Sequence, residues 1–382
     1  MRARMPSALT SAPAAQAGTT LVETMIALTI GLMLLVTLGE VFVSNGGLRR
    51  DLDYSGRLVE NASYAMDRIS DDLRTAGYYA EFDLADAGLT MPAVKPDPCT
   101  ADLNALGAAL PLPIQGYDGG VGLPASCTGG AHAAIRNPKP GSDILVIRRV
   151  DPCVAGPTTA AGCDAAVAGL PYFQVSHCTW TLPHELTELA GPASGWFKLD
   201  TLVSKLGLHN IDCNQNPGAA VADYHRFVVH IYFVSNDDIP GDGIPTLKLA
   251  QLDAGGFTDA SVVPLAEGIE NLQLEYGLDT GTAPDGSADQ FSANPDIYAG
   301  CAGAASPCSA ANWASTVAVK VHMLGRNTKA TAIGYTNQKG YALGLNADGS
   351  ANTIPPFNDR YRRHVYETSV RVYNSSGRNQ QR

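Results

Sequence analysis

The chain has 382 residues, 45% of them apolar, which is enough to bury a sizeable core in one large domain or two ordinary ones. Its formal net charge is −11, and its Lys and Arg residues gather only in short clusters such as Arg148-Arg149 and Arg362-Arg363. We therefore expect no nucleic acid as a partner, because counterion release from a phosphate backbone needs a face of clustered cations.

The first 18 residues have the composition of a cytoplasmic leader, with Arg2 and Arg4, no acid, and many small residues. These small residues precede the apolar stretch instead of following it, so cleavage among them would leave that stretch on the mature chain. Arginines before an apolar segment predict that the N-terminus stays in the cytoplasm and that the rest is exported.

The apolar stretch is uncharged from Thr24 to Gly39 and is bracketed by Glu23 and Glu40. It is a little shorter than the roughly 20 residues of a comfortable membrane span, so we expect the span to extend over about residues 21–43. Beyond it, apolar residues continue at intervals of three, four and seven, at Leu48, Leu52, Val59, Ala62, Met66, Ile69, Leu73 and Ala76. This pattern predicts one helix over residues 19–77, with Gly77 as its stop.

The stretch "AGTTLVETMIALTIGLMLL" resembles the class III signal of type IV pilins. The resemblance implies that prepilin peptidase cuts after Gly18, the last leader residue, and methylates the new N-terminus at Thr19, where pilins usually have phenylalanine. It also implies that Glu23 is the assembly glutamate. A carboxylate at membrane depth needs a partner, and the nearest cation after cleavage is the amine of Thr19, on the same helix or on a neighbouring subunit; we expect pairing between subunits during assembly. The alternative is a plain signal anchor, in which Glu23 merely favours the helix N-terminus through the macrodipole.

Eight cysteines follow the apolar stretch and contain no C-x-x-C motif. An even number behind a membrane signal indicates an oxidising compartment and up to four disulfides, for which 105 pairings exist. The short spacings favour the pairs Cys153 with Cys163 and Cys301 with Cys308, although free buried thiols remain an alternative. The other four cysteines are Cys99, Cys127, Cys178 and Cys213.

After Gly77 the composition shifts to Gly, Pro and short apolar runs, which predicts a strand-rich exported domain over residues 78–382. Alternation is clear in 225–235, where Phe227 and Val229 face one way and Val228 and His230 the other. We expect α+β architecture, in which the long pilin-type helix packs on one antiparallel sheet system with long disulfide-bearing loops. The predicted strands are 143–150, 225–235, 268–278, 316–326 and 362–374.

Segments such as "YHRFVVHIYFVSNDDIPGDGIPTLKL" and "YRRHVYETSVRVYN" resemble the PilW-type minor pilins. The resemblance implies a subunit of the type IV pilus that helps to start assembly in a tip-proximal complex and supports adhesion or twitching motility. Its partners would be other minor pilins, the major pilin, a tip adhesin and prepilin peptidase. It would be a single-pass inner-membrane protein with a periplasmic domain, later incorporated into the extracellular pilus.

Three other patterns carry little weight. "HELTE" (residues 184–188) lacks the second histidine that a zinc protease helix needs. "NDDIPGDG" (residues 236–243) places Pro240 where a calcium ligand should lie, and hairpin turns explain it and "DTGTAPDGSAD" (residues 279–289) better. We therefore expect no metal, no cofactor and no catalytic residues, and we interpret Trp180, Trp196 and Trp313 as core or turn anchors.

Other functions remain open beside the minor pilin. A pseudopilin of a type II secretion system would share the N-terminal signal, although the strand motifs after residue 220 favour the pilus. A membrane-tethered periplasmic enzyme would need a nucleophile and base at a recognisable spacing, which the sequence does not offer. A ligand-binding module formed by the cysteine-bearing loops is compatible with the pilin interpretation.

Overall fold

The computed structural model describes residues 18–82, 84, 89–129, 133–156, 163–176, 178, 197–211, 213, 221–281, 283–331 and 334–380. The chain divides into two compact units, with the boundary between Asp53 and Tyr54. Residues 1–17 of the predicted leader, the "HELTE" motif, Trp180 and Trp196 lie outside the described residues.

A single helix, α1 (Leu21–Thr75), confirms the predicted N-terminal helix within two residues at each end. No proline interrupts it, and Gly77 follows it with a φ of 73°, a conformation that glycine adopts without steric cost. The Gly77 N–H donates to the carbonyl oxygen of Arg148 at 2.9 Å, so the chain turns directly from the helix onto the β-domain.

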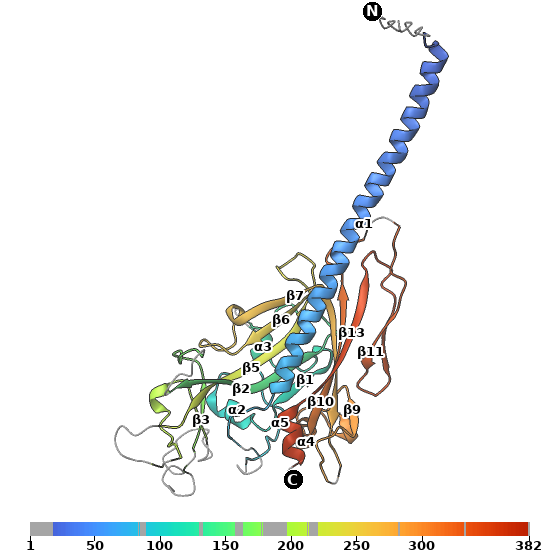
Figure 1. Ribbon diagram of the computed structural model, residues 1–382. Helices are drawn as coiled ribbons and strands as arrows, with labels where there is room; N and C mark the ends of the chain where they lie inside the picture. The colour runs from blue at the N-terminus through green and yellow to red at the C-terminus, as the bar shows by residue number, and fades with distance from the viewer. Residues whose placement is uncertain are drawn as a thin grey trace, which may run out of the picture. The chain divides into compact units, whose positions relative to one another are not determined.

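The strands form a seven-stranded sheet, a four-stranded sheet and a two-stranded ribbon, and every strand pair is antiparallel (Figure 1). Sheet 1 has the order β1-β2-β5-β3-β4, with β6 paired to β5 and β7 to β6, and sheet 2 has the order β13-β10-β8-β9. The strands of sheet 1 are β1 (Ile114–Tyr117), β2 (Ile144–Gly156), β3 (Tyr172–Val175), β4 (Phe197–Asp200), β5 (Tyr224–Ser235), β6 (Thr246–Gln251) and β7 (Val262–Glu267). Those of sheet 2 are β8 (Ile269–Leu278), β9 (Gln290–Ser292), β10 (Thr316–Arg326) and β13 (Arg363–Arg371), and the ribbon is β11 (Tyr341–Leu345) with β12 (Ala351–Ile354).

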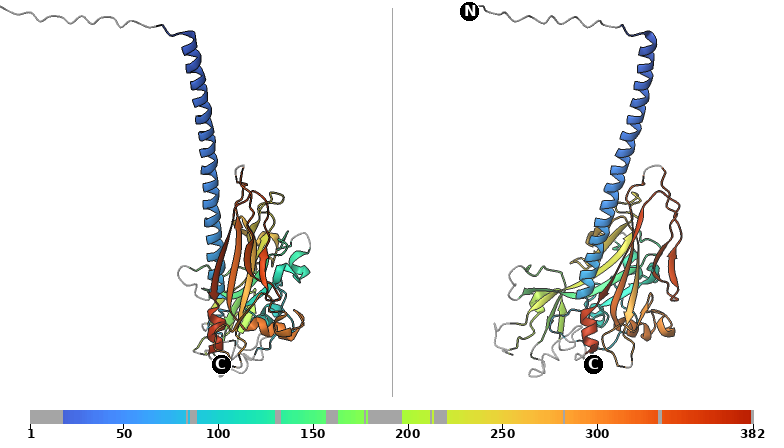
Figure 2. Two further views of the ribbon diagram at one scale, coloured as in Figure 1. Left: turned by 90° about the vertical axis from the view of Figure 1, so that its right-hand side faces the viewer. Right: turned by 45° about the vertical axis from the view of Figure 1, so that its right-hand side comes forward.

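The remaining elements are short helices in the connections. They are α2 (Leu103–Ala108), α3 (Ala125–Thr128), α4 (Pro307–Ala314) and α5 (Tyr373–Gln380), with 3-10 turns at Asp118–Gly120, Val203–Lys205, Asp259–Ser261 and Tyr298–Gly300. The helix α5 lies beside the C-terminal end of α1, where Asn374 Nδ2 donates to the carbonyl oxygen of Ala76 at 3.0 Å (Figures 1 and 2).

All five predicted strands are present, but they belong to two sheets and not to the one sheet system that was expected. The division occurs at Gly268, which joins β7 to β8 with a φ of 81°. Its N–H donates to Pro245 before β6, and its carbonyl oxygen accepts from Arg326 at the end of β10. A residue with a side chain is strained at this φ, and its Cβ would lie 2.5 Å from the carbonyl oxygen of Arg326.

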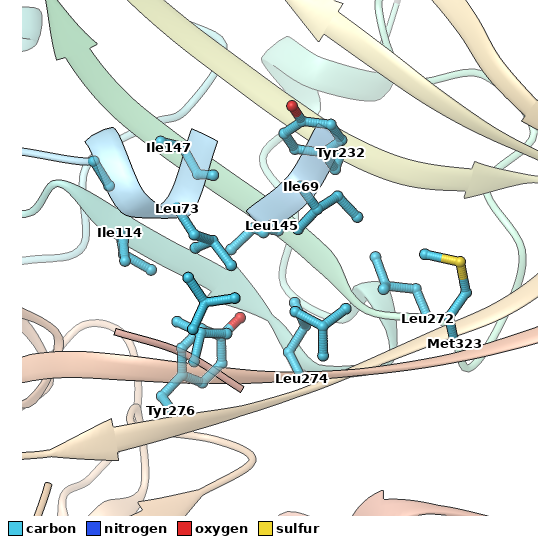
Figure 3. Close-up of a cluster of buried hydrophobic side chains, with 14 of the residues drawn as sticks. Ile69, Leu73, Ile114, Leu145, Ile147, Tyr232, Leu272, Leu274, Tyr276 and Met323 are labelled. Atoms are coloured by element: carbon cyan, nitrogen blue, oxygen red, sulfur yellow. The ribbon is translucent and has the colours of Figure 1, made fainter. Parts of the chain in front are cut away.

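The C-terminal half of α1 fills the core between the two sheets. Ile69 and Leu73 pack between Leu145 and Ile147 of β2 on one side and Leu272, Leu274 and Met323 of sheet 2 on the other (Figure 3). The predicted stripe Ala62, Met66, Ile69, Leu73 and Ala76 is buried, as expected. The other three residues of the predicted stripe, Leu48, Leu52 and Val59, are more than half exposed. Leu58, next to Val59, is buried instead because it faces Gly325 of β10.

The opposite face of sheet 1 covers a second core. Phe227, Val229, Ile231 and Phe233 of β5 belong to it, whereas Tyr232 and Val234 belong to the core under α1. The predicted alternation along this strand is therefore confirmed. Trp313 is also a core anchor, buried edge-to-face against Tyr276 with ring centroids 4.6 Å apart.

Candidate functional site

The N-terminus of α1 is closed by a capping box between Thr20 and Glu23. The Glu23 N–H donates to Thr20 Oγ1 at 3.3 Å, and the Thr20 N–H donates back to Glu23 Oε2 at 3.4 Å. Two N–H groups without a helical partner are thereby satisfied. Thr20 was not predicted as a functional residue, although Thr-x-x-Glu before an apolar run is the pattern that predicts this cap.

The first half of α1 presents apolar side chains on all sides. From Leu21 to Val43 the large apolar residues are more than half exposed, with Leu21 at 77% and Phe42 at 80%. The helix is long and apolar enough to cross a membrane, and none of its most apolar 18-residue window is buried within the protein. Such a surface needs lipid or other apolar helices around it.

Each of the eight cysteines is in a disulfide. The structure joins Cys153 to Cys163 and Cys301 to Cys308, the two pairs that short spacing favours. The longer connections are Cys99 to Cys127 and Cys178 to Cys213, across 28 and 35 residues, with Cα atoms 5.3 and 5.6 Å apart. Three of the four disulfides cross-link segments within or next to the strands of sheet 1. The fourth, Cys301–Cys308, links the segment before α4 to the first turn of α4.

A buried polar cluster fixes the end of α1 to sheet 1. Asp72 is 2% exposed and accepts hydrogen bonds from His230 Nδ1 at 2.5 Å and from the Tyr232 hydroxyl. Arg149 Nη2 of β2 donates to its other oxygen at 3.1 Å. Burial alone would raise the pKa of Asp72, but the hydrogen bond and charge of His230, the Tyr232 hydroxyl and the charge of Arg149 hold it well below its usual range.

His230 was predicted only as a strand residue in the alternating pattern, and Asp72 was not predicted as a functional residue. The sequence does contain a pattern that indicates a role for Asp72, because this acid lies three residues after Ile69 and four before Ala76, within the buried stripe of the helix. An acid at such a position predicts a buried partner.

The acidic glycine-rich stretches are hairpin turns, as predicted. Between β5 and β6, Asp242 accepts backbone hydrogen bonds from Ile239 at 3.0 Å and Ile244 at 2.8 Å. Between β8 and β9, Asp289 Oδ2 accepts from the N–H groups of Thr280 and Gly281. These carboxylates stabilise the local backbone.

One known family resembles this chain. The family described as Type IV Pilus-assembly protein W (PilW) matches residues 231–374. This match supports a PilW-type family for the chain and a relation to type IV pilus assembly. No curated protein and no solved structure matches the chain.

The PilW match covers a coherent part of the fold. It runs from β5 through β6 and β7, includes all of sheet 2 and the ribbon, and ends where α5 begins. Of the four disulfides, only Cys301–Cys308 lies within it. The helix α1 and the loops with the other three disulfides precede the matched residues. Their roles must therefore be inferred from their composition, burial and contacts and not from the family match.

Proposed function

We propose that this PilW-type chain is a minor pilin, a structural subunit that helps to initiate the type IV pilus in a tip-proximal complex. The proposal is carried by one combination: a PilW match over residues 231–374 and, toward the N-terminus, an exposed apolar helix that begins at Leu21 and has Glu23 in its first turn. The first feature indicates the pilus, and the second provides the element by which a subunit would be held first in the membrane and then in a bundle of helices.

In this proposal residues 1–18 are the leader, residues 19–77 the assembly helix with its membrane span at about 21–43, and residues 78–382 the exported domain. Prepilin peptidase cuts after Gly18 and releases the α-amino group of Thr19, which it then methylates. A carboxylate at membrane depth costs roughly 2.5 to 3.5 kcal/mol. The capping box offsets part of this cost within the chain, and the Thr19 amine of an adjacent subunit offsets more of it during assembly.

The four disulfides support export of the domain to the periplasm, since such bonds persist in oxidising compartments. The subunit remains in the inner membrane until other minor pilins and the major pilin take up its helix. The disulfide-bearing loops then lie on the outside of the pilus, where they support adhesion or twitching motility.

The role of Glu23 is tested by Glu23→Ala, with Glu40→Ala near the other end of the apolar stretch as the matched control. Both glutamates lie on α1, but only Glu23 has the Thr20 cap and the proposed intersubunit amine. We expect Glu23→Ala to lose co-purification with the other pilus subunits and to reduce surface pili, while Glu40→Ala keeps both. Wild-type assembly by Glu23→Ala would contradict the proposed contact.

A further inference from the structure

A lysine and an aspartate that are 201 residues apart in the sequence meet in the interior of the β-domain. Lys95 lies in the segment before α2, and Asp296 lies between β9 and α4. Their side chains are 5% and 13% exposed, and Lys95 Nζ lies 2.5 Å from Asp296 Oδ2. An ordinary contact between an ammonium group and a carboxylate measures about 2.7 to 2.9 Å. The carboxyl carbon is one bond further away than Oδ2, so the amine lies within reach of it.

Aromatic rings and burial shield the amine of Lys95 from water. Its Nζ lies 4.1 Å from the centroid of the Tyr117 ring and 5.5 Å from that of the Trp313 ring. Burial lowers the pKa of Lys95, and the charge and hydrogen bond of Asp296 oppose this shift without cancelling it. A desolvated lysine of this kind loses a proton more readily and then acts as a nucleophile.

The other carboxylate oxygen of Asp296 is held by two hydrogen-bond donors. Ser309 Oγ donates to Asp296 Oδ1 at 2.6 Å, and Trp313 Nε1 donates to the same atom at 2.7 Å. Both donors come from α4, and both residues are buried. Two fixed donors on one oxygen stabilise the negative charge that develops there when a nucleophile attacks the carboxyl carbon. Oδ1 is therefore placed to carry that charge, and Oδ2, which faces the amine, is placed to leave.

We propose that Lys95 and Asp296 form an amide bond between their side chains. One proton passes from the Lys95 ammonium group to Asp296 Oδ2, and the neutral Nζ then attacks Cγ, which places a negative charge on Oδ1. The bond from Cγ to Oδ2 breaks, and Oδ2 takes a second proton from the nitrogen and leaves as water. The nitrogen keeps one hydrogen, and no oxidant, reductant or other reactant is consumed.

The product fits the same surroundings as the ion pair. Its single N–H replaces the Lys95 N–H that donates to the carbonyl oxygen of Gly116 at 3.0 Å. Its carbonyl oxygen, the former Oδ1, keeps the hydrogen bonds from Ser309 and Trp313. The reaction also removes two buried charges, whose desolvation is costly. The new bond ties the segment before α2 to the segment before α4, and it does not depend on the proposed role of the chain in pilus assembly.

The test is the mass of tryptic fragments from the purified full chain after its disulfides have been reduced and alkylated. Cleavage after lysine and arginine yields residues 75–136, which contain Lys95, and residues 249–320, which contain Asp296. The disulfides of these two fragments are internal to each. We expect a single species whose mass is the sum of both fragments minus one water molecule. Its fragmentation spectrum should place the link at Lys95 and Asp296.

Lys95→Arg keeps the positive charge but removes the nucleophilic amine, so it should lose the joined species completely. The matched control is Lys320→Arg. Lys320 Nζ lies 3.2 Å from Glu275 Oε2 in a similar pair, but its side chain is 33% exposed, and this variant should keep the joined species. Separate fragments 75–136 and 249–320 from the wild type would overturn the proposal, whether or not Lys95→Arg folds. A joined species that persists in Lys95→Arg would overturn it as well.

Discussion

The side chain of Asp72 decides how firmly the end of α1 is held on sheet 1. In Asp72→Ala, His230 and Arg149 would keep their buried positions without the carboxylate between them. We expect the free energy of unfolding to fall by about 3 kcal/mol or more, the usual cost of breaking a buried charged contact. Chemical denaturation measures the change.

The neighbouring Asp71 is the natural control. It pairs with Arg74 at 2.8 Å, but both side chains are more than half exposed, and such surface pairs contribute about 0 to 1 kcal/mol. Asp71→Ala should therefore leave the free energy of unfolding within about 1 kcal/mol of the wild type. Equal losses in the two variants would mean that the buried cluster does not stabilise the docking of the helix.

A second buried acid, Asp143, makes stability depend on pH. Burial, with the charge of Asp118, raises the pKa of its carboxyl group from 3.8 to about 8, against the opposing hydrogen bonds from Gly119 and Leu274. The folded chain therefore keeps a proton that the unfolded chain has lost. The stability from this proton is complete below pH 3.8 and is lost as the pH rises to about 8.

Asp143→Asn removes this ionisation. Between pH 5 and pH 8 the wild type should lose free energy of unfolding relative to the variant, measured by denaturation at a series of pH values. Since every other titrating group is common to both proteins, the difference between them isolates Asp143. A difference that does not change with pH would contradict the raised pKa.

Among the elements, the local ones were predictable from the sequence and the pairing of distant ones was not. The helix α1 follows from its periodicity and Gly77, and β2, β5, β8, β10 and β13 follow from long apolar or alternating runs. The strands β1, β3 and β4 have only four residues each, too few for a period to be visible. The separation into two sheets at Gly268 could not be predicted, because it depends on the hydrogen bonds of Gly268 with Pro245 and Arg326, which are distant in the sequence.

The same contrast between local patterns and distant contacts applies to the residues of the candidate sites. Glu23 was found because it interrupts an apolar run, whereas the partners of Asp72 lie on strands 77 and 158 residues away along the chain. No local pattern in the sequence brings such segments together.

The disulfides differ in the length of chain that they close, which gives a prediction at the scale of the loop. Cys99–Cys127 closes 28 residues and Cys301–Cys308 closes 7. Loop-closure entropy gives a stabilisation of about 3.5 kcal/mol for the first and about 2.5 kcal/mol for the second. Replacing Cys99 and Cys127 by alanine should thus lower the unfolding midpoint more than replacing Cys301 and Cys308.

The burial of these cysteines acts in the same direction. Cys127 is fully buried and Cys99 nearly so, whereas Cys308 is exposed, so the first pair also loses packing when it is replaced. Denaturation of the two double variants under the same conditions makes the comparison. An equal or reversed order of midpoints would contradict it.

At the scale of the whole molecule, the chain combines a helix whose most apolar window is not buried among the described residues with a domain that has four disulfides, bonds that persist in oxidising compartments. Residues 231–374 of that domain match PilW, which supports a relation of the chain to type IV pilus assembly. We propose that the helix becomes an assembly element when the bond after Gly18 is cut.

The mass of the N-terminal peptide of the mature chain tests that claim most directly. The chain should be isolated from cells that contain prepilin peptidase and from cells that lack it, and its N-terminal peptide analysed by mass spectrometry. The account predicts a mature chain that begins at Thr19, with or without a methyl group on its amine, only in the cells with the peptidase. A chain that begins at Met1 in both, or that begins after residue 40, would contradict it.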